Sequence, residues 1–136
     1  EEMKVTCAIH EIATPKYAFV YDAENDFHRL SHLTFPMIVK HFNSAGSWDL
    51  TKECRVTNGD ELGVQLRRMV ERNQGALVEE FIEGREFTCL LADNCDDLDD
   101  PIAYDPVEYL FLGEGDTFKY ESLKFVTEEA GTLKAV

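Results

Sequence analysis

The chain has 136 residues, a length that predicts one compact unit, or one and a fraction. Hydrophobic residues make up 44% and charged residues 29%, proportions that argue against disorder along the whole chain. The formal net charge of -14 argues against a nucleic-acid binder, because neutralising phosphates needs a basic face. A nucleotide site is not excluded, since it needs only local positive charge and main-chain amides.

The four cysteines are spread widely and form no Cys-x-x-Cys pair; they are Cys7, Cys54, Cys89 and Cys95. A zinc site would need closer paired ligands, so we interpret them as reduced thiols of an intracellular, cytoplasmic protein. Cys54 and Cys89 stand in strand-like runs, where a free thiol is expected to behave as a small buried apolar group. The sequence shows no signal-peptide pattern and no apolar run that could span a bilayer.

The first part of the chain predicts a helix followed by two strands. Apolar residues at helical spacing predict an amphipathic helix over residues 3–12, which ends before Pro15. Aromatic and β-branched residues predict a strand over 16–21. An apolar run predicts a buried strand over 35–42, and the polar stretch 22–33 between the two strands is expected to be irregular or a short helix.

The later elements mix helix and strand without a steady alternation. In chain order they are a loop at 43–47, a strand at 54–57, a helix capped by Asn58 or Asp60 and running to about Arg72, strands from 76 and at 87–91, an acidic flexible loop at 93–100, an interrupted strand at 102–111 and an aromatic segment with two lysines at 118–125. This order favours an α+β fold with antiparallel sheets and packed helices over a doubly wound parallel sheet.

Lys40 is the first candidate for chemistry. It ends an apolar strand and is followed at once by a loop of small residues, 44–47. A lysine at a strand end suits a point-charge contact with phosphate, and a loop of small residues lets main-chain amides approach phosphate oxygens. The alternative is a lysine that reaches solvent beside an ordinary turn.

Three carboxylates gather around the turn at Gly84. Glu79 and Glu80 end a short apolar run, and Glu86 follows the turn. Carboxylates at the end of a buried strand repel one another and lose hydration unless each finds a partner. A ligand that carries hydroxyls and amines would be such a partner. The alternative is a charged hairpin at the surface.

Other candidates carry weaker patterns. His28 and His32 have the i, i+4 spacing of a metal pair on a helix, but no third ligand lies nearby in the sequence. The aspartates of 93–100 lack the glycine-centred register of a calcium loop. Lys124 by itself is an ordinary surface lysine, and Trp48 and His41 flank the small-residue loop, where simple packing would explain them.

Taken together, several segments resemble the ATP-grasp ligases, and most closely the D-alanine–D-alanine ligase group. They are Phe-Pro-Met-Ile-Val-Lys at 35–40, Gly46-Ser47, the run 77–88, the segment 118–124 and Ile-Ala-Thr-Pro-Lys-Tyr at 12–17. The most specific part is the Glu-Glu-Phe-Ile-x-Gly-x-Glu-Phe-Thr run at its distance from Phe-Pro-x-Ile-Val-Lys. The similarity covers nearly the whole chain.

The resemblance implies an ATP-grasp fragment. Residues 1–83 would be the central lid-bearing subdomain with the helix that leads into it, and 84–136 the first strands of an incomplete carboxy-terminal subdomain. Neither end of the chain looks like the natural end of a domain, so we expect a piece of a longer protein. The family holds ATP between two α+β subdomains, activates a carboxylate as an acylphosphate and lets an amine attack it. ATP and Mg²⁺ would be the cofactors, with the metal ligands expected outside this chain. The partners would be ATP and small carboxylate and amine substrates, without nucleic acid or membrane.

At the phosphate end of the nucleotide, the resemblance implies that Lys40 contacts the α-phosphate side. Lys124 would approach the phosphates from the other subdomain. The loop would fold over the phosphates through the amides of Ser44, Ala45, Gly46 and Ser47.

At the base end, the resemblance implies that the Glu79 side chain bonds the adenine amino group. Glu80 and Ile82, with Phe81 between them, would form a hinge whose main-chain groups bond the adenine edge, and Glu86 would take the ribose hydroxyls. These roles agree with the chemistry, because carboxylates accept from the neutral donors of adenine and ribose whereas lysines meet the anionic phosphates.

The chain also departs from the family pattern. Trp48 and Asp49 stand where a small residue and a glycine are expected, and an aspartate beside a triphosphate would be repelled. His41 replaces a usual proline, and Lys4 is only a rough counterpart of a further upstream lysine. Two alternatives stay open: a non-catalytic relative that acts as a binding or interaction module, marked by the altered loop and the acidic segment 93–100, and an α+β scaffold without a nucleotide site.

Overall fold

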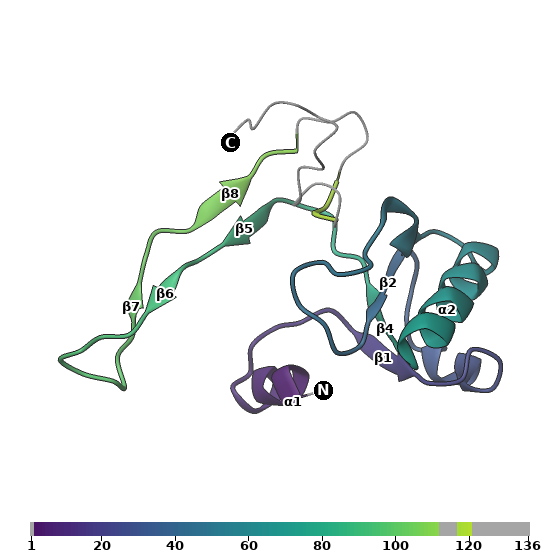
Figure 1. Ribbon diagram of the computed structural model, residues 1–136, viewed down its shortest axis with the longest axis horizontal. Coiled ribbons are helices and arrows are strands. Elements are labelled where there is room, and N and C mark those ends of the chain that lie inside the picture. The colour runs from purple at the N-terminus through teal and green to yellow at the C-terminus, as the bar shows by residue number, and fades with distance from the viewer. Residues whose placement is uncertain (1, 112–116, 121–136) are drawn as a thin grey trace. The chain divides into compact units, whose positions relative to one another are not determined.

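The computed structural model describes residues 2–111 and 117–120, which fall into two units (Figure 1). The first unit holds the described residues up to Ile82 together with Lys119 and Tyr120, and the second holds those of Glu83–Phe118. The assignment of residues 1–83 and 84–136 to two ATP-grasp subdomains stays a prediction. No helix in the described ranges is long and apolar enough to cross a membrane.

The first unit is built on an antiparallel sheet of four strands, as the sequence predicted. The strands are β1 (Tyr17–Val20), β2 (Met37–His41), β3 (Arg55–Val56) and β4 (Ala76–Glu80), and their order in the sheet is β1-β4-β2-β3. β4 pairs antiparallel with both β1 and β2, so the apolar run that starts at Ala76 becomes a central strand. A central strand is flanked by hydrogen-bonded neighbours on both sides, which explains why its residues are apolar at the start.

The helix α2 (Gly59–Asn73) packs against β2 and β4. Asn58 caps it, since its side-chain oxygen accepts a hydrogen bond from the Glu61 amide at 3.0 Å, and Glu61 bonds back to the Thr57 amide at 2.7 Å. One face of the helix is buried, through Leu62, Gln65, Leu66 and Met69. The apolar spacing of the sequence predicts Leu62, Leu66, Met69 and Val70 on this face; the first three are buried and Val70 is partly exposed. The face fills the core together with the buried side chains of the strands, Ala18, Val20, Met37, Val39, Val56 and Val78.

The helix α1 (Glu2–Ile9) contradicts its predicted orientation. The amphipathic pattern that predicts this helix consists of Val5, Ala8, Ile9 and Ile12, and such a pattern would turn these side chains to the core, but all four are exposed. The residue of α1 that is buried is Lys4, which is only 5% exposed. The reason is that Lys4 finds a carboxylate in the sheet, as described for the site below, and this ion pair decides which side of α1 turns inward. Two short 3₁₀ helices complete the unit, Asp26–Leu30 and Lys52–Cys54.

The second unit is a long two-stranded ribbon (Figure 1). β5 (Glu86–Thr88) pairs antiparallel with β8 (Val107–Tyr109), and β6 (Leu91–Ala92) with β7 (Ile102–Ala103). The strand predicted at 87–91 is therefore interrupted, and Cys89 is exposed, so its predicted burial was wrong. A two-stranded ribbon has no second layer to cover its side chains, whereas Cys54 in the first unit is fully buried as expected.

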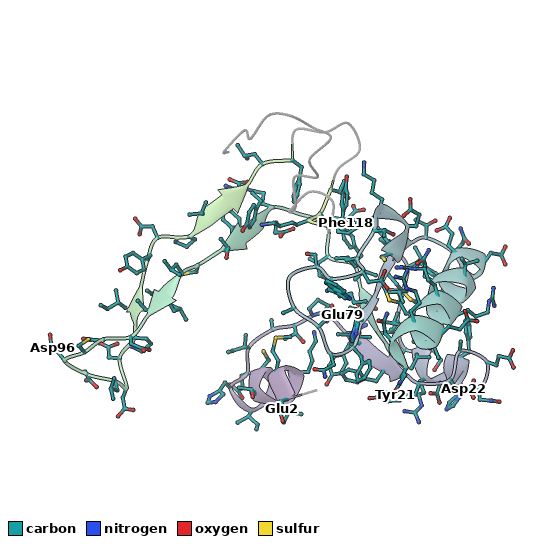
Figure 2. The ribbon with its side chains drawn as sticks, in the orientation of Figure 1. Glu2, Tyr21, Asp22, Glu79, Asp96 and Phe118 are labelled. Carbon is teal, nitrogen blue, oxygen red and sulfur yellow. The ribbon has the colours of Figure 1, made fainter. Side chains whose placement is uncertain are left out.

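The acidic stretch forms the end of this ribbon, where Figure 2 labels Asp96. Its own polar groups close the turn. The Asn94 side chain accepts a hydrogen bond from the Asp96 amide at 3.1 Å and donates one to the Asp100 carbonyl at 3.1 Å, and the Asp97 carboxylate accepts from the Asp99 amide at 3.1 Å. These local bonds are typical of Asn and Asp in turns, and the aspartates serve here as turn formers.

We expect Leu66→Ala to lower the free energy of unfolding by about 2–5 kcal/mol, because Leu66 is fully buried between α2 and the sheet and its truncation leaves a cavity. Urea denaturation followed by far-ultraviolet circular dichroism measures the change. Val64→Ala on the exposed side of the same helix is the matched control and should shift stability by no more than about 0.5 kcal/mol. Equal effects of the two substitutions would show that this face of α2 is not the core.

Candidate functional site

The centre of the candidate site is Glu79, a buried carboxylate on the central strand β4. Its position in the register is opposite Ile38 of β2, so Lys40, two residues further along β2, is its diagonal neighbour on the same face of the sheet. The Lys40 ammonium Nζ lies 2.5 Å from Glu79 Oε2. Lys4 of α1 pairs with the other oxygen, Oε1. Figure 2 shows Glu79 in the interior of the first unit.

The two lysines differ in their contact with water. Lys4 is 5% exposed and its ammonium also lies 5.0 Å from the centre of the Tyr17 ring. The side chain of Lys40 is 37% exposed and reaches the surface. The cluster therefore has one inner and one outer cation around a carboxylate that is 5% exposed. Of the two ammonium groups, that of Lys40 is the one an anion from solvent can approach.

Electrostatics keep Glu79 ionised. Its burial would raise its pKa, but the charges and hydrogen bonds of Lys40 and Lys4 outweigh that effect and hold the pKa of Glu79 below its ordinary value of 4.5. Two ammonium groups and one carboxylate leave one positive charge in excess. The site thus combines a hydrogen-bond acceptor with net attraction for an anion.

The residues after Glu79 are held in an extended conformation by the main chain. The Glu80 amide donates to the Lys16 carbonyl at 3.0 Å, and the Phe81 amide donates to the Pro36 carbonyl at 2.8 Å. The Glu80 side chain turns back to accept hydrogen bonds from the amide and hydroxyl of Thr34, each at 2.9 Å, and these bonds lower its pKa. The Glu80 carboxylate is consequently used inside the protein.

Ile82 differs from its neighbours in the same segment. Its main-chain amide makes no hydrogen bond within the part of the chain that the structure describes, and the residue is 67% exposed. Phe81, just before it, lies under the Arg55 guanidinium, 4.9 Å from the ring centre. The segment therefore offers a main-chain donor at Ile82 beside a buried carboxylate at Glu79.

The small-residue loop follows β2 directly. Gly46 and Ser47 have φ angles of 73° and 63°, and nothing lies within 4 Å of the position where a Gly46 side chain would begin. Among residues 2–111 and 117–120, the amides of Ala45 and Gly46 find no acceptor. Ser47 is fixed, since its hydroxyl donates to the Lys119 carbonyl at 3.3 Å. The loop therefore has main-chain amides without an acceptor among the described residues, while their predicted contact with phosphate stays a prediction.

Asp49 ends this loop and does not act as the sequence suggested. Its carboxylate is buried and lies 2.8 Å from Arg68 Nη1 and 3.4 Å from Arg72 Nη1, while the Asn73 amide group donates to it at 3.2 Å. The two guanidinium groups of α2 offset its charge. The expected repulsion between Asp49 and a bound phosphate is therefore removed by pairing inside the protein.

With this geometry described, the chain can be compared with known proteins. The family described as "D-ala D-ala ligase C-terminus" matches residues 7–130. The chain belongs to this D-alanine–D-alanine ligase C-terminal family. The resemblance stated from the sequence is thereby confirmed, and so is the α+β ATP-grasp fold class.

One curated relative is a D-alanine–D-alanine ligase of Cupriavidus pinatubonensis, which is 31% identical over 83 residues, 60% of this chain and 24% of the relative. Among solved structures, the VanG D-Ala:D-Ser ligase of Enterococcus faecalis has a TM-score of 0.62 at 23% identity, covering 74% of this chain and 28% of that one. A D-alanine–D-alanine ligase of Bacillus anthracis solved with ATP has a TM-score of 0.51 at 25% identity, covering 82% and 39%. The chain thus spans about a quarter of the length of the curated relative it matches.

Two further residues predicted from the family pattern, Glu86 and Lys124, are not described with the first unit. Glu86 belongs to β5 of the second unit, opposite Tyr109, and Lys124 lies outside the described residues. His28 and His32 do not form a metal pair, because their rings bond the separate carbonyls of Asn25 at 2.9 Å and Tyr17 at 3.2 Å. No group of three His, Cys, Asp or Glu side chains within the described ranges is placed to hold a metal.

Lys4 is the residue of the cluster that sequence reasoning missed. It was treated as a rough counterpart of a family lysine, out of register. The helix itself carries no signal for this burial, because a charged side chain is buried only where a partner of opposite charge is available, and the sequence alone could not show that Glu79 is that partner.

The depressed pKa of Glu79 predicts a pH dependence of stability. Because its pKa in the folded state lies below the ordinary value of 4.5, the ionised form stabilises the fold, fully so above about pH 4.5 and progressively less as the pH falls through the folded pKa. We expect Glu79→Gln to lower the free energy of unfolding by about 2–4 kcal/mol at pH 7, since it leaves two lysines without their carboxylate.

The measurement is urea denaturation from pH 7 to pH 3. The difference between wild type and Glu79→Gln should shrink below pH 4.5, while the exposed Glu24→Gln serves as the control and should follow the wild type throughout. A constant difference at every pH would mean that the charge of Glu79 does not stabilise the fold.

Proposed function

We propose that the chain is the ATP-binding part of a carboxylate–amine ligase that works through an acylphosphate. The observation that carries the proposal is the Glu79 carboxylate with Lys40 at its side and the Ile82 amide three residues further on, in a chain of the D-alanine–D-alanine ligase C-terminal family. A carboxylate acceptor and a main-chain donor match the amino group and ring nitrogen of adenine, and the partly exposed lysine matches a phosphate.

In this proposal, nucleotide binding redistributes the contacts of the cluster. Lys40 contacts the α-phosphate side of ATP while Glu79 accepts from the adenine amino group and keeps Lys4 as its buried partner. The amides of Ser44, Ala45, Gly46 and Ser47 cover the phosphates. Glu80 and Phe81 contribute the extended main chain that brings Ile82 to the adenine edge. Glu86 takes the ribose hydroxyls and Lys124 approaches the phosphates, as in the family pattern.

The proposed reaction has two steps. The γ-phosphoryl group of ATP passes to a substrate carboxylate, giving an acylphosphate and ADP, and the amine of a second substrate then attacks the acyl carbon and releases phosphate. Mg²⁺ supplies charge neutralisation at the phosphates. The described residues contain no suitable metal cluster, so we assign the Mg²⁺ ligands to none of them. Small amino acids are the proposed substrates, by analogy with the D-alanine and D-serine in the names of the relatives.

The non-catalytic alternative has less support. It rested on the altered loop and on the acidic segment. The carboxylate of Asp49 is paired with Arg68, so the altered loop is not disabled by charge, and the acidic segment closes a turn of the second unit. A binding module nevertheless remains distinguishable from a ligase by chemistry.

The test is carried out on the full-length protein with MgATP and D-alanine, in the presence of hydroxylamine. Hydroxylamine traps an acylphosphate as a hydroxamate in competition with the amine of a second D-alanine, so a ligase forms ADP equal to the sum of hydroxamate and dipeptide, and omission of D-alanine abolishes all three. ATP binding without ADP formation would favour the binding module. A protein that binds no ATP by calorimetry would contradict the proposal as a whole.

We expect Lys40→Ala to weaken ATP binding by roughly 1.5–3 kcal/mol, the loss typical of a charge-assisted hydrogen bond. Calorimetric titration with MgATP, well below the melting temperature of both proteins, measures it. Lys16→Ala is the control, because Lys16 is a largely exposed lysine of the same unit that pairs with Glu80 at 3.6 Å. Unchanged affinity in Lys40→Ala would remove Lys40 from the site.

A further inference from the structure

The backbone at the end of the small-residue loop adopts a conformation that is unfavourable for residues other than glycine. Ser47 and Asp49 have φ angles of 63° and 56°, in the left-handed region, and they flank Trp48, which is 62% exposed. Aspartate tolerates this region better than most residues, but glycine adopts it at lower cost. Asp49 therefore occupies a position whose backbone alone would favour glycine, and its side chain must explain its presence.

The side chain of Asp49 fastens the loop to α2. Arg68 makes two contacts with this residue, one from Nη1 to the carboxylate at 2.8 Å and one from Nη2 to the main-chain carbonyl at 3.0 Å. Asn73, one turn further along α2, donates to the second carboxylate oxygen at 3.2 Å. The carboxylate is buried, accepts hydrogen bonds from Arg68 and Asn73, and forms a further ion pair with Arg72 at 3.4 Å, so three side chains of one helix hold it.

The helix that receives these contacts is itself fixed. Leu66 and Met69, on either side of Arg68 in the sequence, are fully buried in the core. The Arg68 guanidinium also donates to the buried Cys54 sulfur at 3.1 Å, and the same sulfur accepts from the Thr51 amide at 3.2 Å. Motion of the loop at Asp49 would break the bonds from Arg68 and Asn73 to this residue. Because α2 is itself held in the core, these bonds attach the loop to a rigid element.

We propose that Asp49 is a positioning residue. It holds residues 43–48, the small-residue loop with its flanking residues, in one conformation before nucleotide binds. The inference rests on the proposed function, because the amides of Ala45 and Gly46 are those assigned to the phosphates. An ordered loop loses less conformational entropy on binding than a free one, so the anchor favours ligands that reach the loop. ATP reaches it through its terminal phosphates, whereas AMP extends a shorter distance.

Asp49→Gly is the discriminating variant. Glycine adopts the left-handed backbone at lower cost and lacks the side chain that binds α2. The variant therefore separates the effect of the backbone conformation at residue 49 from the effect of the side-chain contacts. Gln74→Gly is the matched control: Gln74 also has a positive φ, 62°, at the end of α2, but lies outside the loop. Asp49→Asn keeps a polar side chain that can bond Arg68 and Asn73 without the charge, and it guards against a glycine variant that folds poorly.

Loop order is measured first, without nucleotide. We expect amide hydrogen exchange of residues 43–48 to be roughly tenfold faster in Asp49→Gly, with a smaller rise in Asp49→Asn. Trp48 is the only tryptophan among these 136 residues, and its fluorescence anisotropy, measured with any tryptophan elsewhere in the full-length protein replaced by phenylalanine, should fall in the same order. Exchange and anisotropy within a factor of two of the wild type in both variants would overturn the proposal, provided that Gln74→Gly is also unchanged.

Nucleotide binding is measured second, by calorimetry with MgATP and with AMP. We expect Asp49→Gly to weaken ATP binding about fivefold to twentyfold while AMP binding changes less than twofold. An equal loss for ATP and AMP would overturn the positioning role and indicate a general effect on the fold. A wild-type protein that binds neither nucleotide would contradict the proposed function, and the exchange experiment would then still decide whether Asp49 orders the loop.

Discussion

The interaction on which the first unit depends is the burial of the Glu79 carboxylate between two lysines. It joins three elements that are distant in the sequence, since Lys4 comes from α1, Lys40 from β2 and Glu79 from β4. Removing three charges from water is costly, and a buried ion pair often stabilises a fold no more than well-packed apolar residues would. The cluster leaves one positive charge in excess on the protein, and this charge is what the proposed nucleotide site relies on.

The main chain around Glu79 is arranged by two hydrogen bonds to neighbouring segments. The bonds from the Glu80 amide to Lys16 and from the Phe81 amide to Pro36 carry the chain out of the sheet in an extended conformation and leave the Ile82 amide available. On the other side, β2 ends at a loop whose composition is polar and small. Acceptor, cation and donor thus follow one another along the antiparallel pair of β2 and β4: the Ile82 amide lies beyond the end of β4, Glu79 stands opposite Ile38, and Lys40 stands two residues further along β2, toward the loop.

The loop shows how a departure from a family pattern can be compensated. An aspartate in place of glycine introduces a charge and a less favourable backbone conformation. Both costs are compensated by contacts with α2. Arg68 and Arg72 offset the charge of Asp49, and the same contacts hold residue 49 at its positive φ. Interpreting Asp49 from the sequence as a source of repulsion was reasonable for an isolated residue and wrong for one packed against a helix.

The sequence by itself determined the local elements and the family. The apolar spacing of α2, its Asn58 cap and the aromatic, β-branched and apolar runs of the strands are local patterns, and the order of these elements predicted an α+β fold with antiparallel sheets. Only the tertiary structure decided that Lys4 and not Val5 or Ile9 turns inward, that Asp49 is paired, and that Cys89 is exposed on a ribbon without a second layer. The reason is physical: the burial of a charged group depends on a partner from another part of the chain, and periodicity along one segment carries no information about that partner.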